Sequence, residues 1–206
     1  MDVNGLLNIL SLMADRMEKE KAYLTELDNA IADGDHGINM ARGFAAVKGK
    51  LGDYDGKDAG TILKSVGMTL VSVVAGSAGP LYGTAFMRSG MALTDKFEIN
   101  KDDFAACLKA SIDGVMMRGK AQRGEKTMLD AMIPMYDAFT CALESGKDFR
   151  DALKYGIDAA WEGVEYTKTI AATKGRASYI GERSIGHIDP GAVSFTCLME
   201  EIYSAL

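Results

Sequence analysis

The sequence predicts an all-α fold, organised as one domain over residues 1–206. Apolar residues recur at intervals of three and four along almost the whole chain, which is typical of amphipathic helices. No segment alternates apolar and polar residues between turn signals, as a half-buried strand would. The connections between the periodic stretches are short, and short connections favour antiparallel helices packed side by side. With 48% hydrophobic residues, a chain of this length can bury a substantial core.

The first expected helix shows the pattern clearly, because Leu6, Leu10, Met13 and Met17 follow one another at helical spacing. The same reasoning applies along the chain and predicts a series of further helices. In all, nine helical stretches are expected, at approximately residues 6–17, 20–31, 37–51, 57–75, 79–93, 101–118, 126–145, 148–170 and 190–206.

Several helix boundaries have their own signals. Asn100, with Asp103 three residues later, is typical of a helix N-cap and predicts the start of the sixth stretch. Asp189 followed by Pro190 is the corresponding signal for the last stretch. Pro134 falls inside the seventh stretch, so that helix is expected either to kink there or to begin later.

Two connections differ from the others. Residues 119–126 and 171–189 are polar, contain glycine and are too long to be simple turns. Long irregular segments in compact domains often carry function. We therefore expect these two segments to take part in whatever site the protein has.

Composition narrows the possible functions. A net charge of −6 and a pI near 5.0 argue against a nucleic-acid partner, which would call for a basic face. Cys107, Cys141 and Cys197 lie far apart in apolar contexts, which indicates buried thiols in a reducing cytoplasm. The apolar stretch 5–10 follows Asp2 without a preceding basic residue, so neither a signal peptide nor a membrane segment is expected.

The acidic run at residues 28–37 carries the strongest chemical signal. It contains Asp28, Asp33 and Asp35, together with two glycines and a histidine, where a helical pattern breaks. Carboxylate oxygens are hard ligands, and such a cluster suits Mg²⁺, which usually keeps positions open for phosphate oxygens. The alternative is an acidic turn between helices in which Asp33 and Asp35 form Asx turns. The run alone leaves both interpretations open.

Three other runs admit both a functional and a structural interpretation. Small residues at 75–80 could let a phosphate approach the next helix N-terminus, or could form only a tight helix corner. The basic loop 118–127 lacks the Walker A spacing, because Glu125 separates Gly124 from Lys126 and a helix precedes it. It could lie beside a nucleotide or be simply solvated. Residues 173–192 could close a site or form a well-capped connector.

Taken together, four runs resemble the nucleotide-binding L subunits of dihydroxyacetone kinases. The runs are Asp33–Gly37 with upstream Asp28, Gly76–Gly83, Gly124–Asp130, and Gly175–Tyr179 with His187 and Asp189–Ala192. The resemblance spans nearly the whole chain without a departure at these positions. It implies a closed barrel of eight antiparallel amphipathic helices with the nucleotide in the loops at one rim, so one of the breaks between the nine expected stretches should be absent.

The resemblance also implies which residues bind ADP or ATP and two Mg²⁺ ions. Asp28, Asp33 and Asp35 would hold both ions, since three carboxylates offset most of their charge. His36, expected to be a phosphate-binding donor rather than a phosphorylated carrier, would belong to the nucleotide contacts. Those contacts would be His36, Gly37, Ile38, Asn39, Ser77, Ala78, Gly119, Thr127, Met128, Arg176, Asp189, Pro190 and Gly191. No residue is expected to act as a nucleophile.

The family has two versions of the reaction. In one, this domain is fused to a dihydroxyacetone-binding domain and consumes ATP. In the other, it is a separate subunit whose retained ADP accepts a phosphoryl group from a phosphohistidine on a phosphotransferase-system partner and passes it to dihydroxyacetone on the K subunit. The end of the sequence near residue 206 favours the separate subunit. The mechanism expected in both is phosphoryl transfer by positioning and electrostatics.

Two other classes of function remain open. L subunits in some systems also contact a transcription activator, so a nucleotide-dependent regulatory surface is one alternative. A helical barrel that holds a lipid is the other, although a purely lipid-binding role would not require the three aspartates.

Overall fold

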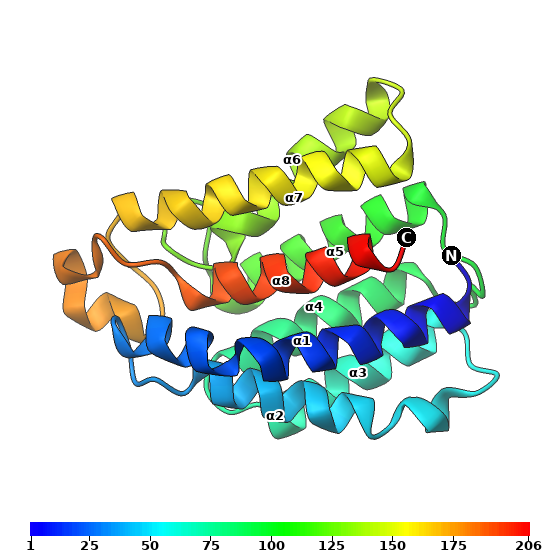
Figure 1. Ribbon diagram of the computed structural model, residues 1–206, viewed down its shortest axis with the longest axis horizontal. Coiled ribbons are helices and arrows are strands. Elements are labelled where there is room, and N and C mark those ends of the chain that lie inside the picture. Colours follow the sequence, from blue (N-terminus) through cyan, green and yellow to red (C-terminus); the bar gives the residue numbers. More distant parts are fainter.

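The computed structural model describes all residues from Met1 to Leu206 and consists of helices joined by short connections (Figure 1). An isolated bridge between Asp2 and Glu98 is the only strand-like pairing, so the expectation of an all-α protein is confirmed. The α-helices are α1 (Val3–Asn29), α2 (His36–Lys48), α3 (Ala59–Val73), α4 (Ala78–Ala92), α5 (Lys101–Gly119), α6 (Leu129–Glu144), α7 (Phe149–Tyr166) and α8 (Pro190–Ser204). Three short 3₁₀ helices are η1 (Leu51–Tyr54), η2 (Thr167–Thr169) and η3 (Arg176–Ser184).

The first two expected helices, at residues 6–17 and 20–31, form a single continuous helix in the structure. The break predicted between residues 17 and 20 is wrong, because α1 continues through it. Met17 and Leu24 are both fully buried, so the apolar face runs on, and Glu18 and Lys19 are merely its solvent side. The chain therefore has eight α-helices, as the family resemblance implied.

Pro134 lies within α6, which begins three residues later than the sequence pattern suggested. A proline lacks the N–H that would bond to the carbonyl four residues earlier, here that of Asp130. At the same place α7 comes very close, since a Cβ on Gly163 would lie 2.0 Å from the Asp130 carbonyl oxygen. The carbonyl group that Pro134 cannot bond is thus the one that Gly163 of α7 approaches.

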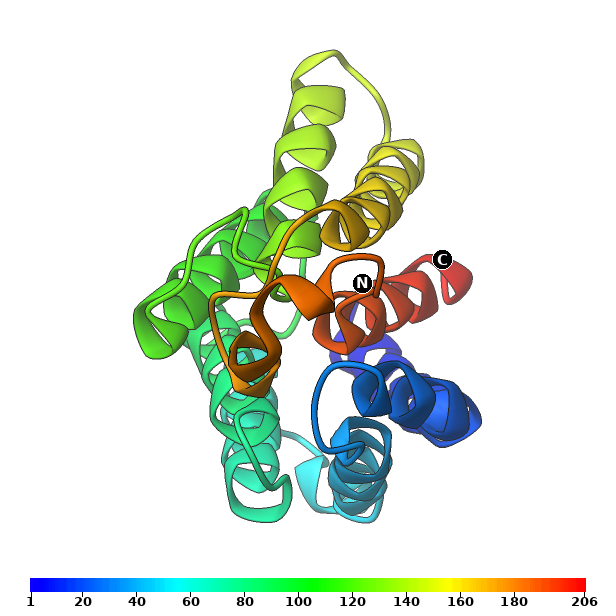
Figure 2. The ribbon, with the colours of Figure 1, turned by 90° about the vertical axis from the view of Figure 1, so that its left-hand side faces the viewer.

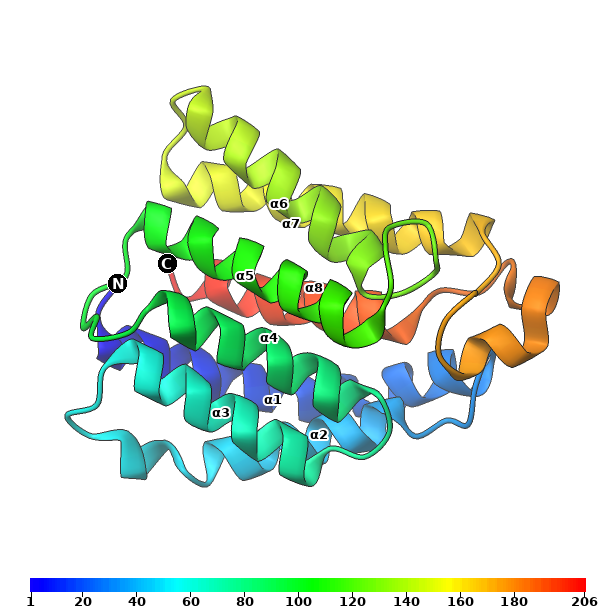
Figure 3. The ribbon, with the colours of Figure 1, turned by 180° about the vertical axis from the view of Figure 1, so that it is seen from behind.

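The helices contact one another in chain order, and α8 also packs against α1 (Figures 1 and 3). This ring of contacts is compatible with the expected barrel. One core cluster of buried residues draws on all eight α-helices. A cavity of about 120 Å³ inside the bundle is lined by 22 residues, of which 20 are hydrophobic. None of the helices combines the length and apolar character needed to cross a membrane.

Alternating helix direction determines what gathers at each end of the bundle. Both chain termini lie at one end, on the right in Figure 1. At the opposite end, which faces the viewer in Figure 2, the odd-numbered helices finish and α2, α4, α6 and α8 begin. The irregular segment expected at 171–189 also lies there and contains η3, interrupted at Gly181 with φ of 54°. This end therefore collects four helix N-termini and the two connections that the sequence singled out, after α5 and after α7.

Candidate nucleotide and metal site

A pocket of about 510 Å³ opens at the end where the even-numbered helices begin. Its wall is polar in large part, unlike that of the interior cavity. Tyr82 and Met128 line both spaces and so lie between them. The wall residues fall within 28–36, 75–82, 115–129, 174–177 and 189–191.

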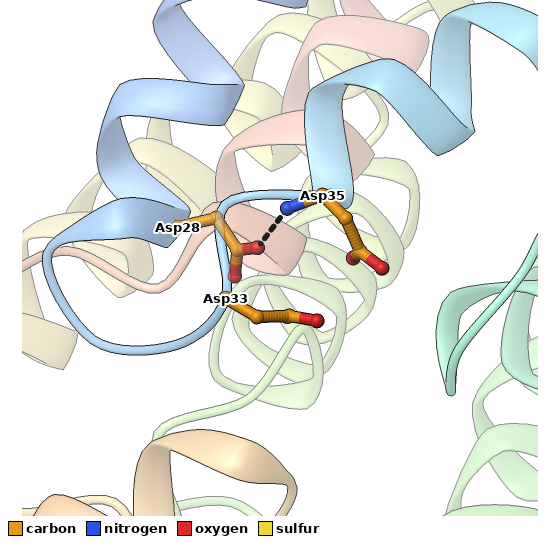
Figure 4. Close-up of side chains that lie close together, drawn as sticks. All are labelled: Asp28, Asp33 and Asp35. Atoms are coloured by element: carbon orange, nitrogen blue, oxygen red, sulfur yellow. Dashed lines mark hydrogen bonds between the residues drawn. The ribbon is translucent and has the colours of Figure 1, made fainter.

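The acidic turn (residues 28–36) brings its three aspartates together (Figure 4). One potential ligand atom from each carboxylate lies within 4.8 Å of those from the other two. Asp28, buried near the end of α1, accepts hydrogen bonds from the backbone N–H groups of Asp35 at 2.9 Å and His36 at 3.1 Å. Gly34 has φ of 73°, a conformation that glycine adopts without strain. Asp28 therefore ties the end of α1 to the start of α2.

The donor set suits a hard divalent cation. All three groups are carboxylates, and Mg²⁺ is typically bound by a few carboxylates and completed by phosphate oxygens and water. The Arg176 guanidinium already contacts Asp33 and lies 3.8 Å from the Asp35 carboxylate. These side chains are about half exposed, so their ion pairs contribute little to stability. The residues present fit the metal role expected for Asp28, Asp33 and Asp35.

Four helix N-termini provide the positive counterpart. His36, Ala78, Leu129 and Pro190, the first residues of α2, α4, α6 and α8, all line the pocket. The first turn of a helix has free N–H groups and a partial positive charge, which together favour anions. Ser77 makes no capping hydrogen bond to α4, so its hydroxyl is uncommitted. A protein of net charge −6 can thus present an anion-binding surface.

His36 connects the pocket to a buried polar chain. Its Nε2 lies 2.9 Å from the Ser194 hydroxyl, and the Tyr82 hydroxyl lies 2.7 Å from the same oxygen. Burial lowers the pKa of His36 to about 4, so the ring is neutral at pH 7. It can therefore serve as a hydrogen-bonding group but not as a cation, in keeping with the phosphate-binding role expected for it.

Asp189 caps α8 at the edge of the pocket. Its Oδ2 accepts a hydrogen bond of 2.7 Å from the N–H of Ala192, and its own N–H donates to the Thr167 hydroxyl at 3.0 Å. Burial raises the pKa of Asp189 to about 7, and the nearby carboxylates of Asp130 and Asp28 act in the same direction. The cap signal read from the sequence is thus confirmed, but this carboxylate is also electrically coupled to the site.

The turn before α6 and the start of that helix contain two residues to which the sequence analysis assigned no role. Asp130 is fully buried and accepts hydrogen bonds from the N–H groups of Gly124 at 2.5 Å and Thr127 at 2.8 Å. Lys126 is 1% exposed and has φ of 59°, a conformation that costs a non-glycine residue about 1–2 kcal/mol. We call residues 122–130, which include the first two residues of α6, the lysine turn. Both residues stand in the run Gly124–Asp130, so a signal existed for them.

Tyr82 and Ser194 were also missed, and their side chains meet His36 only through the packing of α4 and α8 against α2. Most expected contact residues do line the pocket: Asp28, Asp33, Asp35, His36, Ser77, Ala78, Gly119, Thr127, Met128, Arg176, Asp189, Pro190 and Gly191.

Three expected contact residues lie outside the pocket wall. Gly37 packs against α1, where a Cβ would lie 2.1 Å from the carbonyl oxygen of Lys21. Ile38 is 48% exposed on α2. Asn39 is buried, and its Oδ1 accepts a hydrogen bond from Arg42 at 2.8 Å. These three residues therefore belong to the first turn of α2 and do not line the pocket.

The fold and site define a helical domain that belongs to the DAK2 domain family, whose pattern matches residues 30–204. The chain is 42% identical to the protein named PEP-dependent dihydroxyacetone kinase, ADP-binding subunit DhaL, of Escherichia coli K12. That similarity extends over 195 residues, 95% of this chain and 93% of the relative. It is also 42% identical to the PTS-dependent dihydroxyacetone kinase, ADP-binding subunit DhaL, of Lactococcus lactis, over 91% of this chain and 90% of that protein.

A solved structure has the same fold. The dihydroxyacetone kinase from C. freundii in complex with AMP-PNP and Mg²⁺ superposes with a TM-score of 0.74 at 23% identity. The match covers 97% of this chain and 33% of that one, so it supports the all-α fold of this domain and not the activity of the larger enzyme.

Proposed function

We propose that this chain is the ADP-binding subunit of a phosphoenolpyruvate-dependent dihydroxyacetone kinase. The observation that carries the proposal is the carboxylate cluster of Asp28, Asp33 and Asp35 beside four helix N-termini in one pocket. A metal ligand set next to anion-binding backbone groups is what a nucleotide polyphosphate requires. The names and near full-length similarity of the relatives from E. coli and L. lactis support the same function.

The cofactors of this proposal are ADP and two Mg²⁺ ions. Two divalent ions carry four positive charges, and the three aspartates offset most of them, which leaves a slightly positive centre for phosphates. Metal ions in such a site supply charge neutralisation at the transferring phosphoryl group. The presence of Mg²⁺ with AMP-PNP in the C. freundii structure supports the use of this metal.

The chain's own residues would act by binding and orienting. The partial positive charge at the N-terminal ends of α2, α4, α6 and α8 would stabilise negative charge without reorganising, and neutral His36 offers a hydrogen bond to the same region. No side chain of this subunit needs to act as a nucleophile, because the attacking hydroxyl belongs to dihydroxyacetone. We propose that this ketose is held by a K subunit and that a phosphohistidine of a phosphotransferase-system protein recharges the bound ADP.

The alternative is a domain that consumes ATP, as in fused dihydroxyacetone kinases. Similarity over 90% or more of two separate ADP-binding subunits favours the retained cofactor. The two versions differ in how long the nucleotide stays bound, so nucleotide retention distinguishes them.

The first experiment is to purify the protein in Mg²⁺ without added nucleotide and measure the bound nucleotide by acid release and chromatography. Stoichiometric ADP that is lost only after chelation is expected for the cofactor-carrying subunit. A protein that purifies empty and binds ATP reversibly would indicate the ATP-consuming version. Failure to bind any adenine nucleotide in the presence of Mg²⁺ would overturn the proposal.

A further inference from the structure

The segment of residues 168–187, here called the capping segment, leaves the bundle after α7 and returns just before α8. It lies across the open end of the bundle in Figure 2. It carries Arg176, whose guanidinium contacts Asp33 of the acidic turn. The N–H of Gly186 donates to the carbonyl oxygen of Lys168 at 2.8 Å, so the two ends of the segment meet in a neck.

The ammonium group of Lys126 lies in this neck, between the two ends of the capping segment. It donates to the carbonyl oxygens of Thr167 at 2.5 Å, Ile170 at 3.4 Å and His187. Two of these carbonyls lie where the capping segment departs and the third where it returns. A lysine ammonium has three N–H donors, so this group is fully satisfied by the neck alone. The side chain is 1% exposed and holds the backbone in a left-handed conformation at φ of 59°.

The lysine turn also holds the capping segment from outside, through Glu125. The backbone oxygen of Glu125 accepts from the N–H of Thr173 at 3.3 Å, and its carboxylate lies 3.5 Å from the ammonium of Lys174. These contacts are partly solvated, whereas those of Lys126 are buried. Consecutive residues therefore attach the same segment at two points, and the buried attachment is at the neck.

We propose that Lys126 is a positioning residue that keeps the neck of the capping segment closed. The closed neck positions Arg176 against the acidic turn and places Asp189, Pro190 and Gly191 at the pocket wall. A buried charge with three backbone partners at both ends of one segment is a stronger tie than the exposed contacts elsewhere along it. The effect on nucleotide rests on the proposed function, but the closure of the neck does not.

The test is hydrogen exchange in the full-length protein without nucleotide, comparing Lys126→Met with Lys120→Met. The matched control removes an ammonium from a second lysine with positive φ, 48°, that is exposed six residues earlier. In Lys126→Met the N–H groups of Ala172, Gly186 and Asp189, which are bonded inside or beside the segment, should exchange about tenfold faster or more. In the same variant, exchange in α1, α3 and α5 should stay as in the wild type. Lys120→Met should leave exchange unchanged both in the capping segment and in these helices.

A folded Lys126→Met variant with wild-type exchange in the capping segment would overturn the proposal, and so would faster exchange spread evenly over all helices. If Lys126→Met does not fold, Glu125→Ala provides the second test, since it removes only the outer carboxylate. Its effect should be confined to residues near Thr173, with Gly186 still protected. Loss of protection at the neck in Glu125→Ala would show that Lys126 does not hold it.

A second measurement links the neck to ligand binding. The dissociation constant of ADP in saturating Mg²⁺ should rise about tenfold or more in Lys126→Met and stay unchanged in Lys120→Met. If the wild type itself binds no ADP, the proposed function fails while the exchange result still judges the neck. If exchange increases but ADP affinity is unchanged, the positioning role is refuted.

Discussion

The acidic turn and the lysine turn lie at the same end of the bundle and use their charges in opposite ways. In the acidic turn, Asp33 and Asp35 are about half exposed and point into space that a ligand can enter. In the lysine turn, Lys126 and Asp130 are buried and satisfied by backbone groups of the protein itself. The acidic turn presents its charges to a ligand. The charges of the lysine turn instead form buried hydrogen bonds that hold the walls of the pocket in place.

This difference matters because sequence patterns treat both turns alike. Each is a short run of charged residues and glycines between helices, and each can be interpreted as a site or as a solvated loop. The structure separates the two roles by burial. We therefore expect substitutions in the acidic turn to affect ligand binding and substitutions in the lysine turn to affect stability as well.

The largest effect is expected for Asp33→Ala or Asp35→Ala. Loss of either carboxylate should weaken Mg²⁺-dependent ADP binding by about 100-fold or more, equivalent to about 3 kcal/mol, because the remaining pair cannot hold both ions against the phosphates. The midpoint of thermal unfolding without ligand should hardly change, since both side chains are half exposed. Calorimetric titration measures the affinity, with Asp113→Ala on the exposed face of α5 as control. Tight ADP binding by either variant would refute the metal role.

Asp130→Ala should have the converse signature. It leaves the N–H groups of Gly124 and Thr127 unpaired and removes a negative charge that, together with that of Asp189, favours the charged form of buried Lys126. The free energy of unfolding should fall by about 2–4 kcal/mol. Urea denaturation without ligand measures it, and Asp137→Ala, an exposed aspartate on the same helix, should change it little. Unfolding of Asp130→Ala at wild-type urea concentrations would remove the distinction between the two turns.

Asp189 is electrostatically coupled to Asp28 of the acidic turn and to Asp130 of the lysine turn. Its charge should give the smallest expected effect, a dependence of the free energy of unfolding on pH. Its folded-state pKa is raised from 3.8 to about 7, so the folded protein keeps a proton that the unfolded chain has already lost. The stability contributed by this proton is present below about pH 4 and is lost as the pH rises towards 7. An asparagine at this position has no carboxyl proton to lose. The free energy of unfolding of Asp189→Asn, relative to that of the wild type, should therefore increase as the pH rises from about 4 to about 7.

Urea denaturation of both proteins at several pH values, without Mg²⁺ and nucleotide, measures this difference. Asparagine keeps a side-chain oxygen to cap α8, so the comparison isolates the charge. A stability difference that stays constant between pH 4 and pH 7 would show that Asp189 does not titrate in this way.

Much of the architecture could be predicted because it depends on local patterns. The 3.6-residue periodicity marked the helices, and the caps at Asn100 and Asp189 were read correctly from short runs. The acidic turn could be recognised because its three aspartates lie within eight residues of one another, so the local chain alone brings them together. The one helix break that was wrong, near residue 18, came from a polar surface run that only tertiary burial identifies as one face of a longer helix.

The amino-acid sequence by itself determined the helices, their caps, the family and the acidic turn, because each depends on residues close together in the chain. Only the tertiary structure decided that Ser194 and Tyr82 meet His36, 158 residues from Ser194, and that Lys126 lies beneath the neck at His187. Burial and long-range hydrogen bonding depend on how whole helices pack. The same lysine could be solvated or enclosed, and the packing of α6, α7 and α8 decides which.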